Sequence, residues 1–118
     1  MDVRLKRIYE EVSDQDGMRV LVDGMWPRGV SKEAAQLDEW MKAVAPSADL
    51  RKWFGHDPDK FADFKRKYKQ EMHEDEEKKQ ALDQLKSYVK QKKVTLLFAT
   101  KEEEYNHAVV LKEILTKQ

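Results

Sequence analysis

Short apolar runs along this chain predict the strands of a sheet. The segment VRLKRIYE, residues 3–10, alternates apolar and charged positions with one slip, which is typical of a half-exposed edge strand. The runs MRVLV, residues 18–22, and VTLLFAT, residues 94–100, are largely apolar and too short for a helix. Both are therefore predicted to be strands, the first of them an inner strand buried on both faces, and the turn-forming stretch SDQDG, residues 13–17, separates the first two strands.

Elsewhere the apolar residues recur at helical spacing, and capping residues mark where helices begin. The stripes predict a long helix from Ser31 to before Pro46, with Leu37, Trp40, Met41 and Val44 on one face, and then a short helix capped by Ser47. A third helix is opened by Asp57-Pro58 and carries Phe61, Phe64, Tyr68 and Met72. A fourth begins in EDEEKK, residues 74–79, with Leu82, Leu85 and Val89 inward, and the last lies in KEEEYNHAVVLKEIL, residues 101–115.

This order of elements predicts an α/β class fold. The expected architecture is one helix-rich domain over residues 1–118, with a small, mostly parallel sheet of three to four strands surrounded by helices. The charged fraction of 39% is high, but the apolar residues are ordered in runs and stripes, so the charges are interpreted as solvated helix faces and not as a sign of disorder.

Charge and composition exclude several classes of function. The 23 basic and 23 acidic side chains cancel, so no overall field attracts nucleic acid or an anionic membrane, and neither is expected as a partner. The absence of cysteine removes disulfides, thiol nucleophiles and cysteine metal sites. No apolar stretch approaches the roughly 18 residues of a membrane span, so a cytoplasmic protein is expected.

Candidate chemistry gathers after two of the predicted strands. Ligands of open α/β sheets bind beyond the carboxyl ends of the strands, where loops lead into helices. One such loop holds Asp23, Trp26 and Arg28, and the other, ATKEEEYNH, holds Lys101, Asn106 and His107. A guanidinium, an ammonium, an imidazole, an amide and an indole together suit a small anionic or nucleobase-containing ligand, with His107 and Arg28 as the candidate catalytic residues.

Each of these residues also has a structural interpretation. Trp26 is more often a lid on a core than a stacking surface, Arg28 can pair with a carboxylate of a neighbouring helix, and His107 can cap or pack at a helix start. Trp53 and His56 are further ligand-binding candidates, although His56 and Asp57 are not expected to act as an acid–base pair, because Asp57 caps a helix.

Metal and cofactor motifs are missing from the sequence. His56, His73 and His107 lack metal-ligand spacing, and there is no G-x-G-x-x-G, P-loop or G-x-S-x-G, so neither a metal nor a cofactor is expected. The basic stretch KRKYK, residues 65–69, spreads its cations around a helix and is interpreted as solvated surface.

Three motifs, in order and across nearly the whole chain, resemble the YeaO-like branch of the family called domain of unknown function 488. They are RVLVDGMWPRGVSKE, then a Trp followed by APSADLRKWFGHDPDKFADFKRKY, and finally VTLLFATKEEEYNHAVVL. The resemblance implies a small bacterial or archaeal cytoplasmic α/β protein, and it implies no established activity. The positions that match the family pattern are Asp23, Trp26, Pro27, Arg28, Gly29, Pro46, Ser47, Leu50, Trp53, Phe54, His56, Tyr68, Asn106, His107 and Ala108.

The chain departs from the family pattern after Asp23. The family usually has Arg and Leu at the two places that here hold Gly24 and Met25. If the missing arginine shares an anion with Arg28, this protein binds that anion more weakly or uses Lys101 instead. Another branch carries cysteines near the last strand and before the histidine, so its thiol chemistry is excluded here, while a role of His107 common to both branches stays open.

Two functions of different class are therefore carried forward. One is an enzyme or binding protein for a small anionic or nucleobase-containing ligand in a cleft at the strand ends. The alternative is a non-catalytic module that binds a protein or nucleic acid through Trp26, Trp53 and KRKYK. The zero net charge favours the first.

Overall fold

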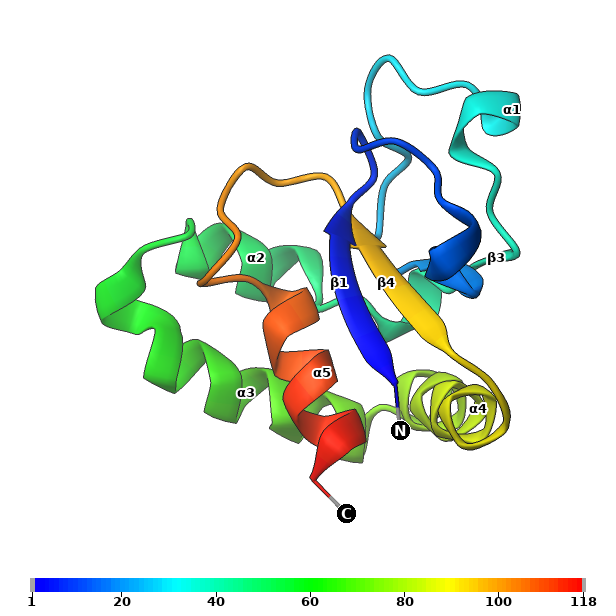
Figure 1. The fold of residues 1–118 in the computed structure, drawn as a ribbon. Coiled ribbons are helices and arrows are strands. Elements are labelled where there is room, and N and C mark those ends of the chain that lie inside the picture. The colour runs from blue at the N-terminus through cyan, green and yellow to red at the C-terminus, as the bar shows by residue number, and fades with distance from the viewer. Residues whose placement is uncertain (1, 118) are drawn as a thin grey trace.

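The computed structural model describes residues 2–117 and contains a four-stranded sheet in which every strand runs parallel to its neighbours (Figure 1). The strands are β1 (Val3–Arg7), β2 (Met18–Leu21), β3 (Glu39–Trp40) and β4 (Val94–Phe98), in the spatial order β1-β4-β2-β3. The α/β class and the parallel sheet are thereby confirmed, with β1 at an edge and β2 and β4 inside, as their hydrophobic patterns predicted.

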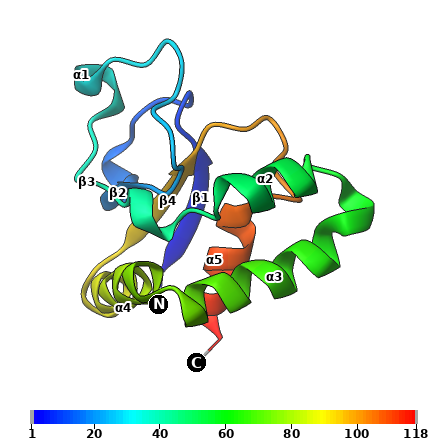
Figure 2. The ribbon, with the colours of Figure 1, turned by 180° about the vertical axis from the view of Figure 1, so that it is seen from behind.

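Helices connect the strands and cover the sheet (Figures 1 and 2). They are α1 (Lys32–Ala35), α2 (Ala48–Phe54), α3 (Phe61–Glu74), α4 (Glu76–Gln91) and α5 (His107–Thr116), with short 3₁₀ turns at η1 (Asp14–Asp16), η2 (Lys42–Val44) and η3 (Pro58–Lys60). The predicted caps are present, because the side chains of Ser47 and Asp57 accept hydrogen bonds from the backbone amides of Leu50 and Asp59. Among residues 2–117, no helix is both long and apolar enough to cross a membrane.

Alternation along the strands divides the core between the two faces of the sheet. Val20 and Leu96 belong to the main core, which also contains side chains of α2, α3, α4 and α5. Leu21 and Leu97, one residue further along each strand, belong to a smaller cluster that includes Trp26 and other residues of the segment between β2 and β3. Four helices therefore cover one face, and α1 with neighbouring loops covers part of the other.

A buried ion cluster ties β1 and β2 together on the second face. The Asp16 carboxylate lies 2.6 Å from Arg19 Nη1 and 3.0 Å from Lys6 Nζ, and it also accepts a hydrogen bond from the Ser13 amide. The Arg19 guanidinium donates in addition to the Ala35 carbonyl. Burial raises the pKa of Asp16, but these hydrogen bonds outweigh it, so that the pKa lies below the ordinary value of a carboxyl group.

The long helix predicted after Ser31 is wrong. Ser31 does cap α1, but α1 ends after one turn because Gln36 adopts the left-handed conformation, at φ 46° and ψ 52°. The chain then runs beside β2, where the Met41 amide donates to the Leu21 carbonyl, and Trp40 becomes part of β3. The apolar spacing that suggested one helix therefore arises from a helical turn, a two-residue strand and a 3₁₀ turn in succession.

The last helix begins later than predicted, at His107 and not directly after the strand. The Asn106 side chain caps α5 by accepting a hydrogen bond from the Val109 amide, and its own amide donates to the Glu102 carbonyl at 2.6 Å. Residues 101–106 consequently form a loop beyond the carboxyl end of β4.

Candidate functional site

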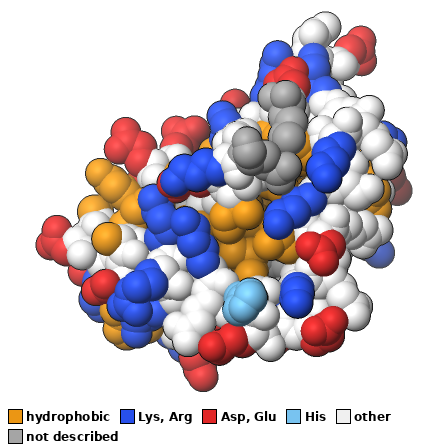
Figure 3. Space-filling view, turned by 90° about the horizontal axis from the view of Figure 1, so that it is seen from below, with side chains coloured by type: hydrophobic (Ala, Val, Ile, Leu, Met, Phe, Trp, Pro, Cys, Tyr) orange, Lys and Arg blue, Asp and Glu red, His pale blue; other side chains and the backbone are white. Residues whose placement is uncertain are grey.

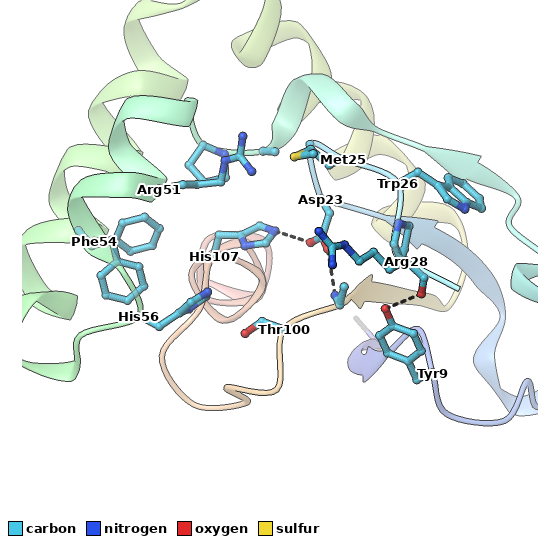
Figure 4. Close-up of a pocket in the computed structure, with 16 residues that line it drawn as sticks. Tyr9, Asp23, Met25, Trp26, Arg28, Arg51, Phe54, His56, Thr100 and His107 are labelled. Atoms are coloured by element: carbon cyan, nitrogen blue, oxygen red, sulfur yellow. Dashed lines mark hydrogen bonds and ion pairs between the residues drawn. The ribbon is translucent and has the colours of Figure 1, made fainter. Parts of the chain in front are cut away.

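A pocket of about 390 Å³ lies beyond the carboxyl ends of β2 and β4 (Figure 4). Its walls come from the loop after β2, from α2 and the residue that follows its C-cap, from the start of the loop after β4, and from the first residue of α5. This is the position at which open α/β sheets bind their ligands, and the volume falls within the range of small-molecule sites.

Five of the predicted site residues line this one pocket: Asp23, Trp26, Arg28, His56 and His107. The two predicted loops therefore lie side by side, and Arg28 and His107 line the same pocket. This agrees with the rule that the carboxyl ends of parallel strands meet at one edge of the sheet.

Asp23 and His107 form the polar floor of the pocket. Asp23 Oδ2 accepts a hydrogen bond of 2.9 Å from the Ala99 amide. His107 Nε2 lies 3.1 Å from the Val22 carbonyl oxygen and 3.0 Å from Asp23 Oδ1, and because both neighbours are acceptors, Nε2 must carry a hydrogen. Asp23 Oδ1 is buried and, within residues 2–117, has no hydrogen bond of its own, so its close contact with the imidazole is electrostatic.

Two guanidinium groups approach the pocket from opposite sides (Figure 4). Arg28 extends from the loop after β2, where its backbone carbonyl accepts a hydrogen bond from the Tyr9 hydroxyl. Arg51 extends from α2, and its guanidinium lies beside Gly24. Within residues 2–117 neither guanidinium has a carboxylate within 4.0 Å or a side-chain hydrogen bond. The pairing of Arg28 with a neighbouring carboxylate, one of the two sequence-based alternatives, is therefore not seen.

An aromatic wall closes the side of the pocket next to α2 and α3. Phe54 and Phe64 stack with ring centroids 4.1 Å apart and an interplanar angle of 14°. His56 has its ring centroid 5.6 Å from that of Phe54, and its ring points into the pocket (Figure 4). Within residues 2–117, His56 is also one of two non-glycine residues with a positive φ, at 55°, a conformation that is unfavourable for most side chains and concentrates at functional sites.

Trp26 lines the pocket as part of the smaller core. Its Nε1 donates to the Val30 carbonyl at 2.7 Å, and its ring packs edge-on against Trp40, with centroids 5.3 Å apart. Since its donor is already used, Trp26 can offer a ligand only its ring, which agrees with the interpretation of this residue as a lid on a core.

Three other predicted site residues are not among the residues that line the pocket. Trp53 lies in a shallow groove on the α3 side of α2, with Lys67 Nζ 4.5 Å and Lys60 Nζ 5.2 Å from a ring centroid. Lys101 is exposed in the loop after β4. Asn106 is fully buried, and its oxygen caps α5 while its nitrogen donates to the Glu102 carbonyl of the preceding loop. The second cation of the pocket is therefore Arg51 and not Lys101.

The cations of KRKYK are spread over different neighbours, as the helical spacing predicted. Lys65 pairs with Glu113 at 2.8 Å and Arg66 with Asp63 at 3.3 Å. Lys69 belongs to a shallow groove on the face that carries both chain ends, where basic side chains flank hydrophobic ones (Figure 3). This face lies at the opposite end of the strands from the pocket that Trp26 lines.

Arg51 and Tyr9 also line the pocket, although the sequence did not single them out as site residues, and so does Thr100, the residue with which the second half of the proposed site begins. Thr100 lies in the second predicted loop, so the strand-end rule contained a signal for it. Arg51 looks like any other exposed cation of a short helix, and only the packing of α2 brings it to the pocket. In the part of the chain that the structure describes, no three His, Asp or Glu side chains are grouped so that they could hold a metal ion.

Fold and site together define a parallel α/β protein with a cationic, partly aromatic pocket at the ends of its strands. The chain belongs to the DUF488-N3i family, described as the inactive DUF488-N3 subclade, whose sequence model matches residues 2–118. This confirms the resemblance to the domain of unknown function 488.

Relatives of known sequence agree with this assignment. The uncharacterised protein YeaO of Escherichia coli K12 is 39% identical over 117 residues, which cover 98% of this chain and 97% of YeaO. The uncharacterised protein Rv3073c of Mycobacterium tuberculosis is 39% identical over 113 residues, which cover 96% of this chain and 92% of the relative. No solved structure matches the chain.

Proposed function

We propose that this protein binds a small ligand that combines an anionic group with a flat, largely apolar part, in the pocket at the strand ends. The observation that carries the proposal is that two guanidinium groups, those of Arg28 and Arg51, line one pocket without an acidic partner among residues 2–117. Guanidinium forks suit carboxylate and phosphate oxygens, which they bind through paired hydrogen bonds.

The other lining residues support the same ligand chemistry. Among the described residues that line the pocket, Asp23 is the one carboxylate, and it is already engaged by the Ala99 amide and by His107, so the two guanidinium groups leave the pocket with a net positive charge. The wall formed by Phe54, Phe64 and His56 is suited to a flat apolar group, because aromatic rings pack favourably face to face or edge to face.

Binding without turnover fits the pocket better than catalysis. The pocket has two hydroxyl groups: that of Tyr9 donates to the Arg28 carbonyl, and that of Thr100 accepts from the Glu102 amide. Neither is hydrogen-bonded to His107 within residues 2–117, so the nucleophile–base pair that covalent catalysis requires is missing there. The description of the family as an inactive subclade supports the same conclusion. In this proposal His107 and Arg28 are ligand-binding residues.

A thermal-shift screen of nucleotides, sugar phosphates and aromatic carboxylates tests the proposal, with inorganic phosphate included as the anion alone. A ligand present at about 100 times its dissociation constant stabilises the folded state by about 2.7 kcal/mol. At least one aromatic anion is expected to raise the melting temperature, and Arg28→Ala is expected to reduce that shift.

Arg66→Ala is the matched control, since it also removes one arginine but on the outer surface of α3, where Arg66 pairs with Asp63. This control should keep the full shift. An absence of any shift across the screen, or equal shifts in the wild type and in Arg28→Ala, would contradict the proposed function.

A further inference from the structure

We infer that the anionic group of the ligand is the dianionic phosphoryl group of a phosphate monoester, held between Arg28 and Arg51, and that Gly24 provides the space in which Arg51 lies. This inference rests on the proposed function, because it specifies the ligand of the same pocket. It starts from the packing of Gly24.

Gly24 lies directly against the Arg51 guanidinium. A Cβ atom added at Gly24 would be 3.8 Å from Arg51 Nη2, 3.9 Å from Arg51 Cζ and 3.5 Å from the Ala45 Cβ. These are ordinary van der Waals distances, so a methyl group fits there, whereas a larger side chain would extend into the space of the guanidinium. The backbone does not require glycine, because the positive-φ glycines are Gly17, Gly29 and Gly55.

The charges of the pocket favour a dianion. Among residues 2–117 neither guanidinium has a carboxylate within 4.0 Å, so a carboxylate or sulfate ester would offer both of them a single negative charge to share. A phosphate monoester carries close to two charges at neutral pH, because its second pKa is about 6, and it offers three acceptor oxygens. Arg28 and Arg51 approach from opposite sides, which allows each to bind different oxygens of one phosphoryl group (Figure 4).

The aromatic wall indicates where the organic part of the ester lies. Phe54, Phe64 and His56 line the same pocket as the two arginines. A ring attached through one oxygen to the phosphoryl group therefore places its face near this wall while the phosphoryl group reaches the guanidinium groups. Phenyl phosphate is the simplest probe with both parts, and phenyl sulfate has the same ring and bridging oxygen but a single charge.

Isothermal titration calorimetry of both probes at a pH of about 7.5 tests the inference. Phenyl phosphate is expected to bind at least about tenfold more tightly than phenyl sulfate, since each additional charged hydrogen bond is worth roughly that factor or more. Arg51→Gln removes the positive charge, and Gly24→Val displaces the Arg51 guanidinium. Each substitution should therefore lower the affinity for phenyl phosphate to about that for phenyl sulfate.

Gly24→Ala is the matched control for Gly24→Val, because its methyl group makes only ordinary contacts, and it should retain the wild-type preference. Thermal denaturation establishes that each variant folds. If Gly24→Val does not fold, the comparison of Arg51→Gln with the wild type tests the inference. Equal affinities of the wild type for both probes, with both weakened by Arg28→Ala, would overturn this inference and leave the proposed function standing. If the wild type binds neither probe, the inference is overturned. The proposed function still stands in that case if an aromatic carboxylate binds and Arg28→Ala weakens its binding.

Discussion

Replacing Asp16 with asparagine is expected to destabilise the protein strongly, because it removes the charge that neutralises two cations on the second face of the sheet. The Asp16 carboxylate contacts Arg19 Nη1 at 2.6 Å and Lys6 Nζ at 3.0 Å. The side chains of Asp16 and Arg19 are only 6% and 5% exposed, so water cannot substitute for the lost partner. Asparagine keeps the shape of the side chain and one acceptor oxygen, and the substitution therefore isolates the effect of the charge.

The structure sets the expected size of the loss. Removing one partner of a buried ion pair costs about 3–5 kcal/mol of the free energy of unfolding. Lys6 is 17% exposed, and the Arg19 guanidinium retains its hydrogen bonds to backbone carbonyls, so we expect a loss near the lower end, about 3 kcal/mol. Against a total stability of about 5–15 kcal/mol, this is a large fraction, and urea unfolding at neutral pH measures it directly.

The pH dependence gives a second and independent measure. Because the pKa of Asp16 in the folded protein lies below its ordinary value of 3.8, the stabilisation is fully present above that ordinary value and is lost as the pH falls through the folded-state pKa. The difference in unfolding free energy between the wild type and Asp16→Asn should therefore be constant from neutral pH down to about pH 5 and should shrink below about pH 4.

Asp14→Asn is the matched control, since Asp14 belongs to the same 3₁₀ turn but is exposed to solvent. It should change the stability by less than about 0.5 kcal/mol. A loss below about 1 kcal/mol in Asp16→Asn, or a difference that stays unchanged at about pH 3, would refute the reasoning that the buried charge is stabilised by its two cations.

Three further substitutions test the packing of the fold by urea unfolding. Gly17→Ala should cost roughly 2–5 kcal/mol, because φ is 65° and the new Cβ would lie 2.5 Å from the Lys93 carbonyl oxygen, whereas Gly29→Ala, at φ 74° with open space around it, should cost only about 1–2 kcal/mol. Equal losses would show that the close contact is relieved without cost. Tyr68→Phe should cost about 1–3 kcal/mol, because it leaves the buried Val44 carbonyl without the hydrogen bond of 2.5 Å from the Tyr68 hydroxyl. A loss below about 0.5 kcal/mol would indicate that the carbonyl finds another donor.

The inner strands could be predicted because a strand that is buried on both faces has a continuous run of apolar residues. Every residue of β4 is buried, and the apolar run at residues 94–98 reports this. β3 has no such sequence pattern, since a strand of two residues is too short to show a repeat. Its formation depends on the left-handed turn at Gln36 and on backbone hydrogen bonds to β2, neither of which has a signature in the apolar spacing.

Most of the correctly placed site residues follow strands of the sheet, and His56, beyond the C-cap of α2, is the exception. Asp23 and His107 follow strands, and the rule that parallel strands end at one edge brought them together. Arg51 comes from a helix whose packing angle no local pattern specifies, so its place in the pocket could not be predicted. Asn106 shows the opposite error, because an amide that precedes a helix can cap it or bind a ligand, and here its two polar atoms are used within the loop and the helix.

Asp23 links the pocket to the stability of the fold. Its backbone carbonyl accepts a hydrogen bond from Trp40 Nε1, its Oδ2 accepts one from the Ala99 amide, and its Oδ1 lies beside His107, so one residue connects the ends of β2, β3 and β4 with the start of α5. The floor of the pocket is consequently organised before any ligand arrives, which reduces the free-energy cost of ordering it on binding.

The two arginines are not constrained in this way. Both are exposed, and within residues 2–117 their guanidinium groups have no partner that fixes them, so in the proposed function the ligand would order them. Substitutions at Arg28 or Arg51 should therefore weaken binding with little change in stability, whereas substitutions at Asp23 should lower both together. In the proposed function, a pocket with a rigid floor and adaptable cations would accept anions attached to rings of different size. The charge would then define the ligand class, and the aromatic wall of Phe54 and Phe64 would select the organic part.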